Sequence, residues 1–259
     1  MVQSDSTWKN KTVLITGASR GLGADCAHYF GKKGARLLLI ARSESEIQSI
    51  ARQYANALPL AADLGSLEAI AKLGKQIESS VDLVDVAIHC AGGGLGLKDP
   101  VLSGPQLNQL FQLNVTAGVE INKFIIPAMK KAQRGNILHI GSIASTDAVG
   151  SVGYNTCKAA LAAYVRSLGK VLASDGIIVS GLLAGGFFSS GGAMDRLQKN
   201  NPAAYEDFLQ KRIPRKKFGE FNEMIPLIEF LASPMAGMMC GCLVPMDGGE
   251  GSSYVPVDL

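Results

Sequence analysis

The sequence predicts an α/β fold in which a doubly wound parallel sheet carries helices on both faces. Two observations predict it. Short apolar runs such as VLIT, LLLI and VAIH alternate along the chain with longer amphipathic stretches. These runs are continuously apolar, which is typical of strands buried on both faces. Strands that alternate with helices need crossover connections, and such connections produce a parallel sheet covered on both sides.

Seven apolar runs are the expected strands: Thr12–Thr16, Arg36–Ile40, Ala57–Ala61, Leu83–His89, Asn136–Ile140, Ile177–Leu183 and Cys242–Met246. Six amphipathic stretches are the expected helices: Leu22–Lys33, Glu44–Tyr54, Leu67–Ser79, Gln106–Lys131, Val152–Ser174 and Glu223–Ala232. Residues 1–8 are expected to form a flexible tail, and residues 9–259 a single domain. The periodicity breaks in a stretch rich in Gly, Ser and Phe, so residues 186–218 are interpreted as a substrate lid.

Composition argues against several classes of function. The net charge of +3 is weak and scattered, so no nucleic-acid partner is expected. No run of about 18 apolar residues exists, and the polar N-terminus lacks a signal-peptide pattern, so no membrane association is expected. The five cysteines show no CxxC spacing and there are only three histidines, so no metal site is expected. A reducing, cytoplasmic location fits these features.

A glycine-rich turn follows the first expected strand, in the segment Thr16-Gly17-Ala18-Ser19-Arg20-Gly21-Leu22-Gly23. Gly17 permits the tight turn, Gly21 lets backbone approach a pyrophosphate, and Gly23 lets the helix pack closely on the sheet. The helix N-terminal amides then face the phosphates. The GxxxGxG spacing could also mark only a tight strand–helix turn. Its place after the first buried strand favours a dinucleotide site.

The residues after the next two strands predict which dinucleotide binds. NAD sites commonly place an acid after the second strand, but here that strand runs into Arg42 and Ser43. Arg42, together with Arg20, can pair with a 2′-phosphate, which predicts NADP(H). Two alternatives are solvated arginines and an NAD role for Glu44, which is expected in the first helical turn. Asp63, after the third strand, is a candidate for the adenine edge or for a helix cap.

Tyr154 and Lys158 are the candidate proton-transfer pair. They are four residues apart, so on a helix they share one face. An ammonium about 5 Å from a phenolate stabilises it by roughly 3 kcal/mol at an effective dielectric of about 20. Ser142 stands at the expected end of another strand, where its hydroxyl can donate to a substrate oxygen as negative charge develops. Taken singly, each could be an ordinary core, surface or turn residue, but together with the glycine turn they favour catalysis.

Further motifs accompany the glycine turn, Ser142 in GSIAS and the Tyr154 to Lys158 segment: His89-Cys90-Ala91-Gly92, Asn114 in LNV, and Met246-Asp247-Gly248-Gly249. On these motifs, over nearly its whole length, the chain resembles the short-chain dehydrogenase/reductase family, and within it the 3-oxoacyl-ACP reductase-like members. The resemblance implies a Rossmann-type seven-stranded sheet with the order 3-2-1-4-5-6-7. It also implies that Asn114 holds a water relay behind Lys158, and that Lys158 contacts the nicotinamide ribose.

The candidate catalytic residues are therefore Asn114, Ser142, Tyr154 and Lys158. The candidate cofactor-binding residues are Gly17, Ser19, Arg20, Gly21, Leu22, Gly23, Arg42, Ser43, Asp63, Leu64, Cys90, Ala91, Gly92, Tyr154, Lys158, Gly185 and Ser189.

Four positions depart from the family pattern. His89 replaces an amide of the usual Asn-Asn-Ala-Gly, and is interpreted as a neutral structural histidine or as a group titrating near the cofactor. Cys90 is interpreted as an inert thiol rather than a nucleophile. The stretch after the sixth strand, where the family usually has Pro-Gly, reads Leu183-Ala184-Gly185-Gly186 here. Gly185 keeps the close backbone approach, but the rigid proline is missing. Ser189 stands where a threonine usually touches the cofactor.

The sequence thus predicts an NADP(H)-dependent oxidoreductase that interconverts a ketone and a secondary alcohol. The substrate is left open between a 3-oxoacyl thioester on acyl carrier protein or CoA and a nucleotide-linked or free sugar. Basic residues of the lid could meet an anionic handle or form a solvated face: Lys211, Arg212, Arg215, Lys216 and Lys217. A non-catalytic dinucleotide-binding regulator is disfavoured because it would need none of the catalytic residues. Small residues along 154–172, with the family resemblance, predict a homodimer or homotetramer.

Overall fold

Seven parallel strands form one sheet in a computed structural model that describes residues 8–252. The strands are β1 (Thr12–Thr16), β2 (Arg36–Ala41), β3 (Ala57–Ala61), β4 (Val86–His89), β5 (Gly135–Ser142), β6 (Ile177–Ala184) and β9 (Leu243–Met246). Their order is β3-β2-β1-β4-β5-β6-β9. Because β9 is the seventh strand of this sheet along the chain, the expected doubly wound order is confirmed.

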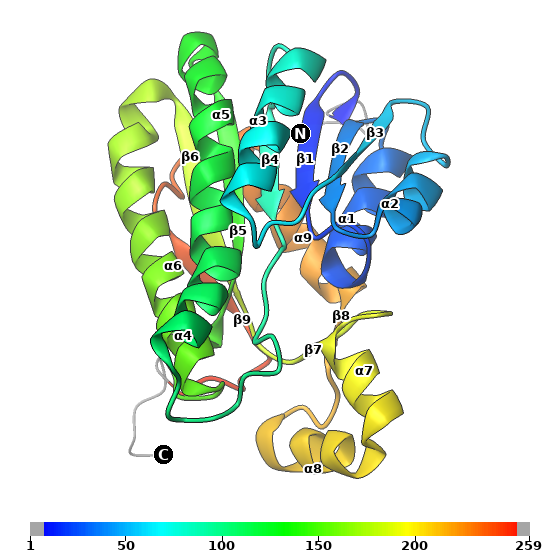
Figure 1. Cartoon of the computed structure of the whole chain (residues 1–259), viewed down its shortest axis with the longest axis vertical. Helices are drawn as coiled ribbons and strands as arrows, with labels where there is room; N and C mark the ends of the chain where they lie inside the picture. Colours follow the sequence, from blue (N-terminus) through cyan, green and yellow to red (C-terminus); the bar gives the residue numbers. More distant parts are fainter. Residues whose placement is uncertain (1–7, 253–259) are drawn as a thin grey trace.

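Helices cover both faces of the sheet (Figure 1). One layer holds α1 (Gly21–Lys32), α2 (Glu44–Ala51) and α9 (Phe221–Leu231), and the other holds α3 (Leu67–Ser80), α4 (Gly104–Phe111), α5 (Ala117–Ala132) and α6 (Val152–Leu172). Successive strand residues face opposite layers. Val13 and Ile15 pack in the first core, whereas Leu14 between them packs in the second. Burial on both sides explains why the strands are continuously apolar.

The expected continuous helix at 106–131 is wrong, because a π-helical segment, Gln112–Thr116, separates α4 from α5. The wider turn contains Asn114, whose side-chain Nδ2 donates to Leu110 O at 2.9 Å and to Gly93 O at 3.0 Å. Single π turns inside helices are often found at functional sites. This one directs Asn114 toward the segment that follows β4.

Segment 186–218 contains two helices that the sequence periodicity did not reveal, α7 (Ala193–Asn200) and α8 (Pro202–Arg212). The local signal for α8 is Asn201, whose side chain accepts from Ala204 N at 3.0 Å, followed by proline in the first turn. A short strand, β7 (Phe187–Phe188), pairs in parallel with β8 (Gly219–Glu220) and closes the segment at its base. Figure 1 shows α7 and α8 beyond the carboxyl ends of the strands.

Trp8, expected in the flexible tail, belongs to the core instead. Its side chain is buried, its ring meets Phe30 edge-on at 4.5 Å, and its Nε1 donates to Glu229 at 2.6 Å. The apolar core buries the indole ring, and the carboxylate at the edge of the core accepts the hydrogen bond of its one polar group. Residues 1–7 of the expected tail lie outside the described residues.

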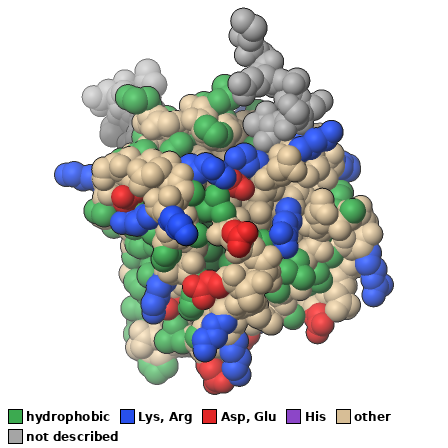
Figure 2. All heavy atoms as spheres, turned by 90° about the horizontal axis from the view of Figure 1, so that it is seen from above, with side chains coloured by type: hydrophobic (Ala, Val, Ile, Leu, Met, Phe, Trp, Pro, Cys, Tyr) green, Lys and Arg blue, Asp and Glu red, His purple; other side chains and the backbone are tan. Residues whose placement is uncertain are grey.

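On the face shown in Figure 2, basic and acidic side chains are interspersed and do not gather by sign. Within residues 8–252, no helix combines the length and the apolar character that crossing a membrane requires. Over the same range, no three His, Cys, Asp or Glu side chains lie close enough together to hold a metal ion.

Candidate active site

A cleft of about 880 Å³ lies at the carboxyl ends of the strands. This is the place where parallel α/β sheets bind ligands, because the strand order reverses direction there between β1 and β4. Most of the sequence-predicted site residues line it: Gly17, Ser19, Arg20, Gly21, Leu22, Gly23, Arg42, Ser43, Asp63, Leu64, Cys90, Ala91, Gly92, Ser142, Tyr154, Lys158 and Gly185. Asn114 and Ser189 are buried outside this lining.

The glycine turn forms a cradle that only glycine can build. Gly17 and Gly21 have φ of +66° and +60°, in the left-handed region that disfavours other residues. A β-carbon on Gly23 would lie 2.3 Å from Gly17 O. Arg20 at the helix N-cap provides no side-chain cap for α1. The N-terminus of α1 lies at the cleft, where the helix dipole favours an anion such as a dinucleotide pyrophosphate. The first amide of the helix, Gly21 N, donates to Ser190 O at 3.1 Å in this structure.

The two predicted cations both line the cleft. Arg42 and Arg20 are exposed residues that line the cleft, while Glu44 lies in the first turn of α2 as expected. The alternative of Asp63 as a helix cap is wrong, because Ser66 caps α3 by accepting from Ala69 N at 3.2 Å. Asp63 instead accepts from Gly65 N at 3.0 Å and stays exposed at the cleft.

Ser142, Tyr154 and Lys158 meet on one wall of the cleft. Ser142 ends β5, where its Oγ accepts from Ala144 N at 3.1 Å. Tyr154 and Lys158 lie one turn apart near the start of α6. Lys158 is only 4% exposed, its Nζ donates to Ile140 O at 3.0 Å, and the same Nζ lies 5.5 Å from the centroid of the Tyr154 ring. The ammonium is therefore buried beside the phenol and does not extend into solvent.

Asn114 is buried next to these residues, outside the lining of the cleft. Its Oδ1 accepts from Gly93 N at 2.9 Å. A β-carbon on Gly92 would lie 2.8 Å from that Oδ1 and 3.5 Å from Lys158 Nζ, so the three residues converge. A cavity of about 10 Å³, lined by Asn114, His89 and His139 among others, lies deeper in the sheet. Its volume and polar groups suit one water molecule.

His89 is a neutral structural residue, as favoured from the sequence. Its Nε2 lies 2.9 Å from Asn122 Oδ1, and Asn122 Nδ2 donates to Tyr164 Oη at 3.0 Å and lies 3.4 Å from His139 Nε2. Burial lowers the pKa of His89 to about 4. Burial also holds the pKa of His139 well below its usual value, and His89 and Lys158 add to that effect. The alternative that His89 titrates near the cofactor is not supported.

Three further residues, Ser189, Glu250 and Arg212, differ from their sequence-based expectations in whether they line the cleft. Ser189 hydrogen-bonds the Asp25 carboxylate on α1 rather than lining the cleft. Glu250 lines the cleft and directly follows the Asp247-Gly248-Gly249 motif, but it was not among the residues predicted from the sequence. Arg212, considered only as part of a basic run, also lines the cleft. The residues that Glu250 and Arg212 contact are distant in sequence, so periodicity could not reveal them. The only local indication was an acidic residue directly after Gly248-Gly249.

A model of the short chain dehydrogenase family matches residues 11–200. The chain belongs to the short-chain dehydrogenase family. The match covers the glycine turn and all four candidate catalytic residues, so the fold and the cleft described above are those of an oxidoreductase family. The seven-stranded sheet order expected from the resemblance is the one observed.

Individual relatives of this short-chain dehydrogenase differ in their substrates. The 3-oxoacyl-[acyl-carrier-protein] reductase FabG of Pseudomonas aeruginosa is 29% identical over 251 residues, which cover 93% of this chain and 97% of the relative. A cyclohexanol dehydrogenase of Rhodococcus sp. is 26% identical over 264 residues, with coverages of 93% and 96%. Among solved structures, L-sorbose reductase of Gluconobacter frateurii, complexed with NADPH and L-sorbose, has a TM-score of 0.85 at 26% identity, with coverages of 95% and 98%.

Proposed function

We propose that this short-chain dehydrogenase is an NADP(H)-dependent oxidoreductase that interconverts a ketone and a secondary alcohol. The observation that carries the proposal is the wall formed by Ser142, Tyr154 and the buried Lys158, in the same cleft as the glycine cradle. A protein that only sensed a dinucleotide would gain nothing from burying an ammonium beside a cleft-facing phenol, because burying a charge costs free energy.

The glycine turn and the arginines are proposed to hold the cofactor. The first-turn amides of α1 would face the pyrophosphate. Arg42 and Arg20 would pair with a 2′-phosphate, since guanidinium groups make charge-assisted bonds to phosphate. NADPH bound to the L-sorbose reductase of similar fold supports this choice. When bound, NADPH supplies the hydride that reduces the carbonyl carbon.

The chain's own residues would handle the proton. Tyr154 Oη gives its proton to the carbonyl oxygen as the alcohol forms, and takes it back in the reverse direction. Ser142 Oγ donates a hydrogen bond to the same oxygen as its negative charge develops. Lys158, with its Nζ 5.5 Å from the Tyr154 ring centroid, stabilises the phenolate that remains. Asn114, beside the water-sized cavity, supports return of a proton from solvent.

Segment 186–218 is proposed to act as the lid. It touches the glycine turn across the cleft, because Gly21 N donates to Ser190 O at 3.1 Å. A β-carbon on Gly191 would lie 3.1 Å from Arg20 Cβ. A lid in this position would exclude water from the reacting atoms and retain the cofactor.

A 3-oxoacyl thioester is the first proposed substrate, because 3-oxoacyl-[acyl-carrier-protein] reductases are similar over 93% of the chain. A sugar is the second, and one observation favours it. The basic run of the lid is largely neutralised by ion pairs, including Lys211 with Asp207 and Arg215 with Glu223. A paired surface is a poorer docking site for an acidic carrier protein than free cations would be.

A substrate panel tests the proposal. NADPH oxidation is followed by absorbance with 3-oxoacyl thioesters and with free or nucleotide-linked keto sugars in parallel, with Tyr154→Phe as the control for each. Turnover on either class that Tyr154→Phe abolishes supports the proposal and chooses the substrate. Tight NADPH binding without turnover on any ketone would support the non-catalytic regulator instead.

A further inference from the structure

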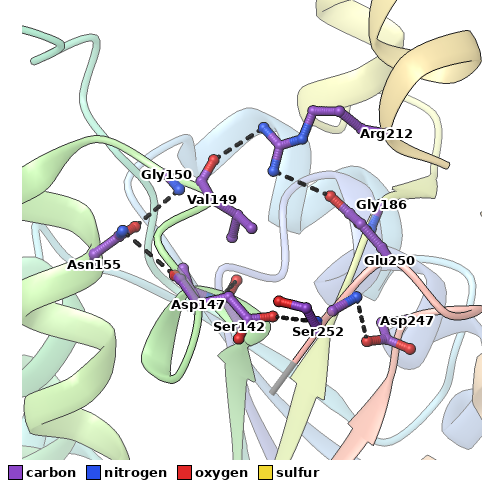
Figure 3. Close-up of polar contacts among 12 residues, drawn as sticks. Ser142, Asp147, Val149, Gly150, Asn155, Gly186, Arg212, Asp247, Glu250 and Ser252 are labelled. Carbon is purple, nitrogen blue, oxygen red and sulfur yellow. Dashed lines mark hydrogen bonds and ion pairs between the residues drawn. The ribbon is translucent and has the colours of Figure 1, made fainter. Parts of the chain in front are cut away.

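Glu250 is a buried carboxylate at the end of the cleft opposite the arginines that are proposed to bind the 2′-phosphate. It follows β9, and its side chain is only 4% exposed. Its Oε2 accepts from Gly186 N at 2.6 Å, and its Oε1 lies 3.5 Å from Arg212 Nη2 (Figure 3). One carboxylate thus holds the loop after β6 and the last residue of α8 at the same time.

Arg212 extends this connection to a third segment. Its Nη1 donates to Val149 O at 3.0 Å, and its guanidinium lies 4.7 Å from the Phe208 ring of the same helix. Val149 belongs to the loop that leads into α6. One guanidinium–carboxylate pair therefore joins three segments: helix α8, the loop before α6 and the segment after β9.

The loop before α6 is itself tied to the segment after β9. Asn155, next to the catalytic tyrosine, accepts from Gly150 N at 2.9 Å and donates to Asp147 O at 3.4 Å. Asp147 Oδ2 accepts from Ser252 N at 2.9 Å. Figure 3 shows these contacts beside Ser142, where they link the loop before α6 to the segment after β9.

The loop that Glu250 holds connects β6 to β7 and consists of two glycines. Its backbone is also tied by Gly185 N, which donates to Met246 O at 3.2 Å, and by Gly186 O, which accepts from Gly219 N at 3.1 Å. Neither glycine has a side chain that restricts its backbone, so contacts from other segments must fix the conformation of the loop. A β-carbon on Gly185 would lie 2.6 Å from Asp247 Cβ and 2.9 Å from Glu250 Oε2, so the loop is pressed against the segment after β9. The Glu250 side chain adds a side-chain contact to the backbone contacts that hold this loop.

We propose that Glu250 is a positioning residue that orders the Gly185–Gly186 loop and, through Arg212, fixes the lid helix α8 over the cleft. The assignment of this loop to the nicotinamide end rests on the proposed function; the mechanical coupling of loop and lid does not. Arg212→Met should release α8 and the Val149 loop while the Gly186 contact remains. Glu250→Gln should act in the same way, because an amide oxygen can still accept from Gly186 but carries no charge for Arg212. Glu250→Ala should release both the lid and the loop.

Hydrogen exchange of the full chain, followed by mass spectrometry without ligand, tests the coupling directly. Arg212→Met and Glu250→Gln should raise exchange in 202–212 and 146–151 by about threefold or more, as loss of a partly buried ion pair implies. Glu250→Ala should also raise exchange in 185–188. Lys211→Met is the matched control: it removes the neighbouring cation of α8, which pairs with Asp207 of the same helix, and should leave all three regions unchanged.

Binding and kinetics supply a second readout. Arg212→Met should raise KM for the ketone more than it lowers kcat and leave the NADPH dissociation constant nearly unchanged. Glu250→Ala should also weaken NADPH binding. Unchanged exchange at α8 in both Arg212→Met and Glu250→Gln, or equal effects from Lys211→Met, would overturn the proposal. If Glu250→Ala does not fold, the other two variants decide. If the parent protein does not bind NADPH, the proposed function fails while the exchange comparison still tests the coupling.

Discussion

His89 and His139 stack face to face in the middle of the sheet, with ring centroids 4.5 Å apart and planes inclined by 17°. They are register partners on the adjacent strands β4 and β5. The Asn122 side chain lies within hydrogen-bonding distance of both rings and holds them between the sheet and α5. Two imidazoles so close together and shielded from water are stable only when neutral, because each added charge would be desolvated and would repel the other.

This pair predicts acid sensitivity. Burial lowers the pKa of His89 from 6.5 to about 4, so between these values the unfolded chain binds more protons than the folded one. The contribution of His89 to the free energy of unfolding is fully present above about pH 6.5 and is lost as the pH drops toward 4. The loss is on the order of 3 kcal/mol. Urea unfolding at several pH values between 7.5 and 4.5 measures it. His89→Asn should flatten the dependence, and an equal slope in both proteins would contradict this account.

Tyr154→Phe should retain NADPH binding and lose turnover by a factor of about 10²–10⁴ or more, as expected when a general acid–base is removed. Fluorescence titration gives the binding and stopped-flow absorbance gives the rate. Tyr205→Phe is the control, since Tyr205 lies on α8 and packs near Phe218. Retained turnover in Tyr154→Phe would exclude the proposed proton donor.

Arg42→Ala should erase most of the preference for NADPH. The parent protein is expected to bind NADPH at least tenfold more tightly than NADH, a gap of about 1.4 kcal/mol. Isothermal titration with both nucleotides measures the ratio. Arg52→Ala, at the other end of α2 and outside the cleft lining, should leave it unchanged. Equal affinities in the parent would show that the cation after β2 does not choose the cofactor.

Gly23→Ala should damage the cradle. The new β-carbon would lie 2.3 Å from Gly17 O and 2.8 Å from Gly17 C, and neither backbone atom can move without distorting the turn. Overpacking of this kind costs about 1–3 kcal/mol, and NADPH binding should weaken with it. Gly104→Ala serves as the control, because a β-carbon on Gly104 would have no neighbouring atom within 4 Å. Thermal unfolding and nucleotide titration of both variants provide the comparison.

Self-association through the outer helices is a further expectation. The exposed fractions of Val152 and Val171 on α6 are 54% and 65%, and that of Phe111 on α4 is 37%. In the oligomer predicted from the sequence, we expect another copy of the chain to cover these side chains. A homodimer or homotetramer of the 27.2 kDa chain should therefore appear by light scattering at micromolar concentration. A monomeric mass would contradict the expectation.

Local sequence determined the elements whose partners lie nearby. The apolar runs predicted all seven strands of the sheet, because burial on both faces leaves a pattern within each strand. Tyr154 and Lys158 were predictable as a pair because one helical turn brings them together without help from the rest of the chain. Asn201 and Pro202 carried a start signal for α8, but the surrounding Gly- and Ser-rich composition hid it.

The tertiary structure decided what depends on residues distant in sequence. The π turn at Asn114 exists because its side chain reaches Gly93, 21 residues away. Trp8 can lie in the core because Glu229, 221 residues later, accepts a hydrogen bond from its indole N–H. Glu250 became visible as a site residue only when the fold brought it to Gly186, 64 residues earlier. Sequence periodicity records what a residue buries within its own element, whereas partners across the fold are chosen by packing, which leaves no local pattern.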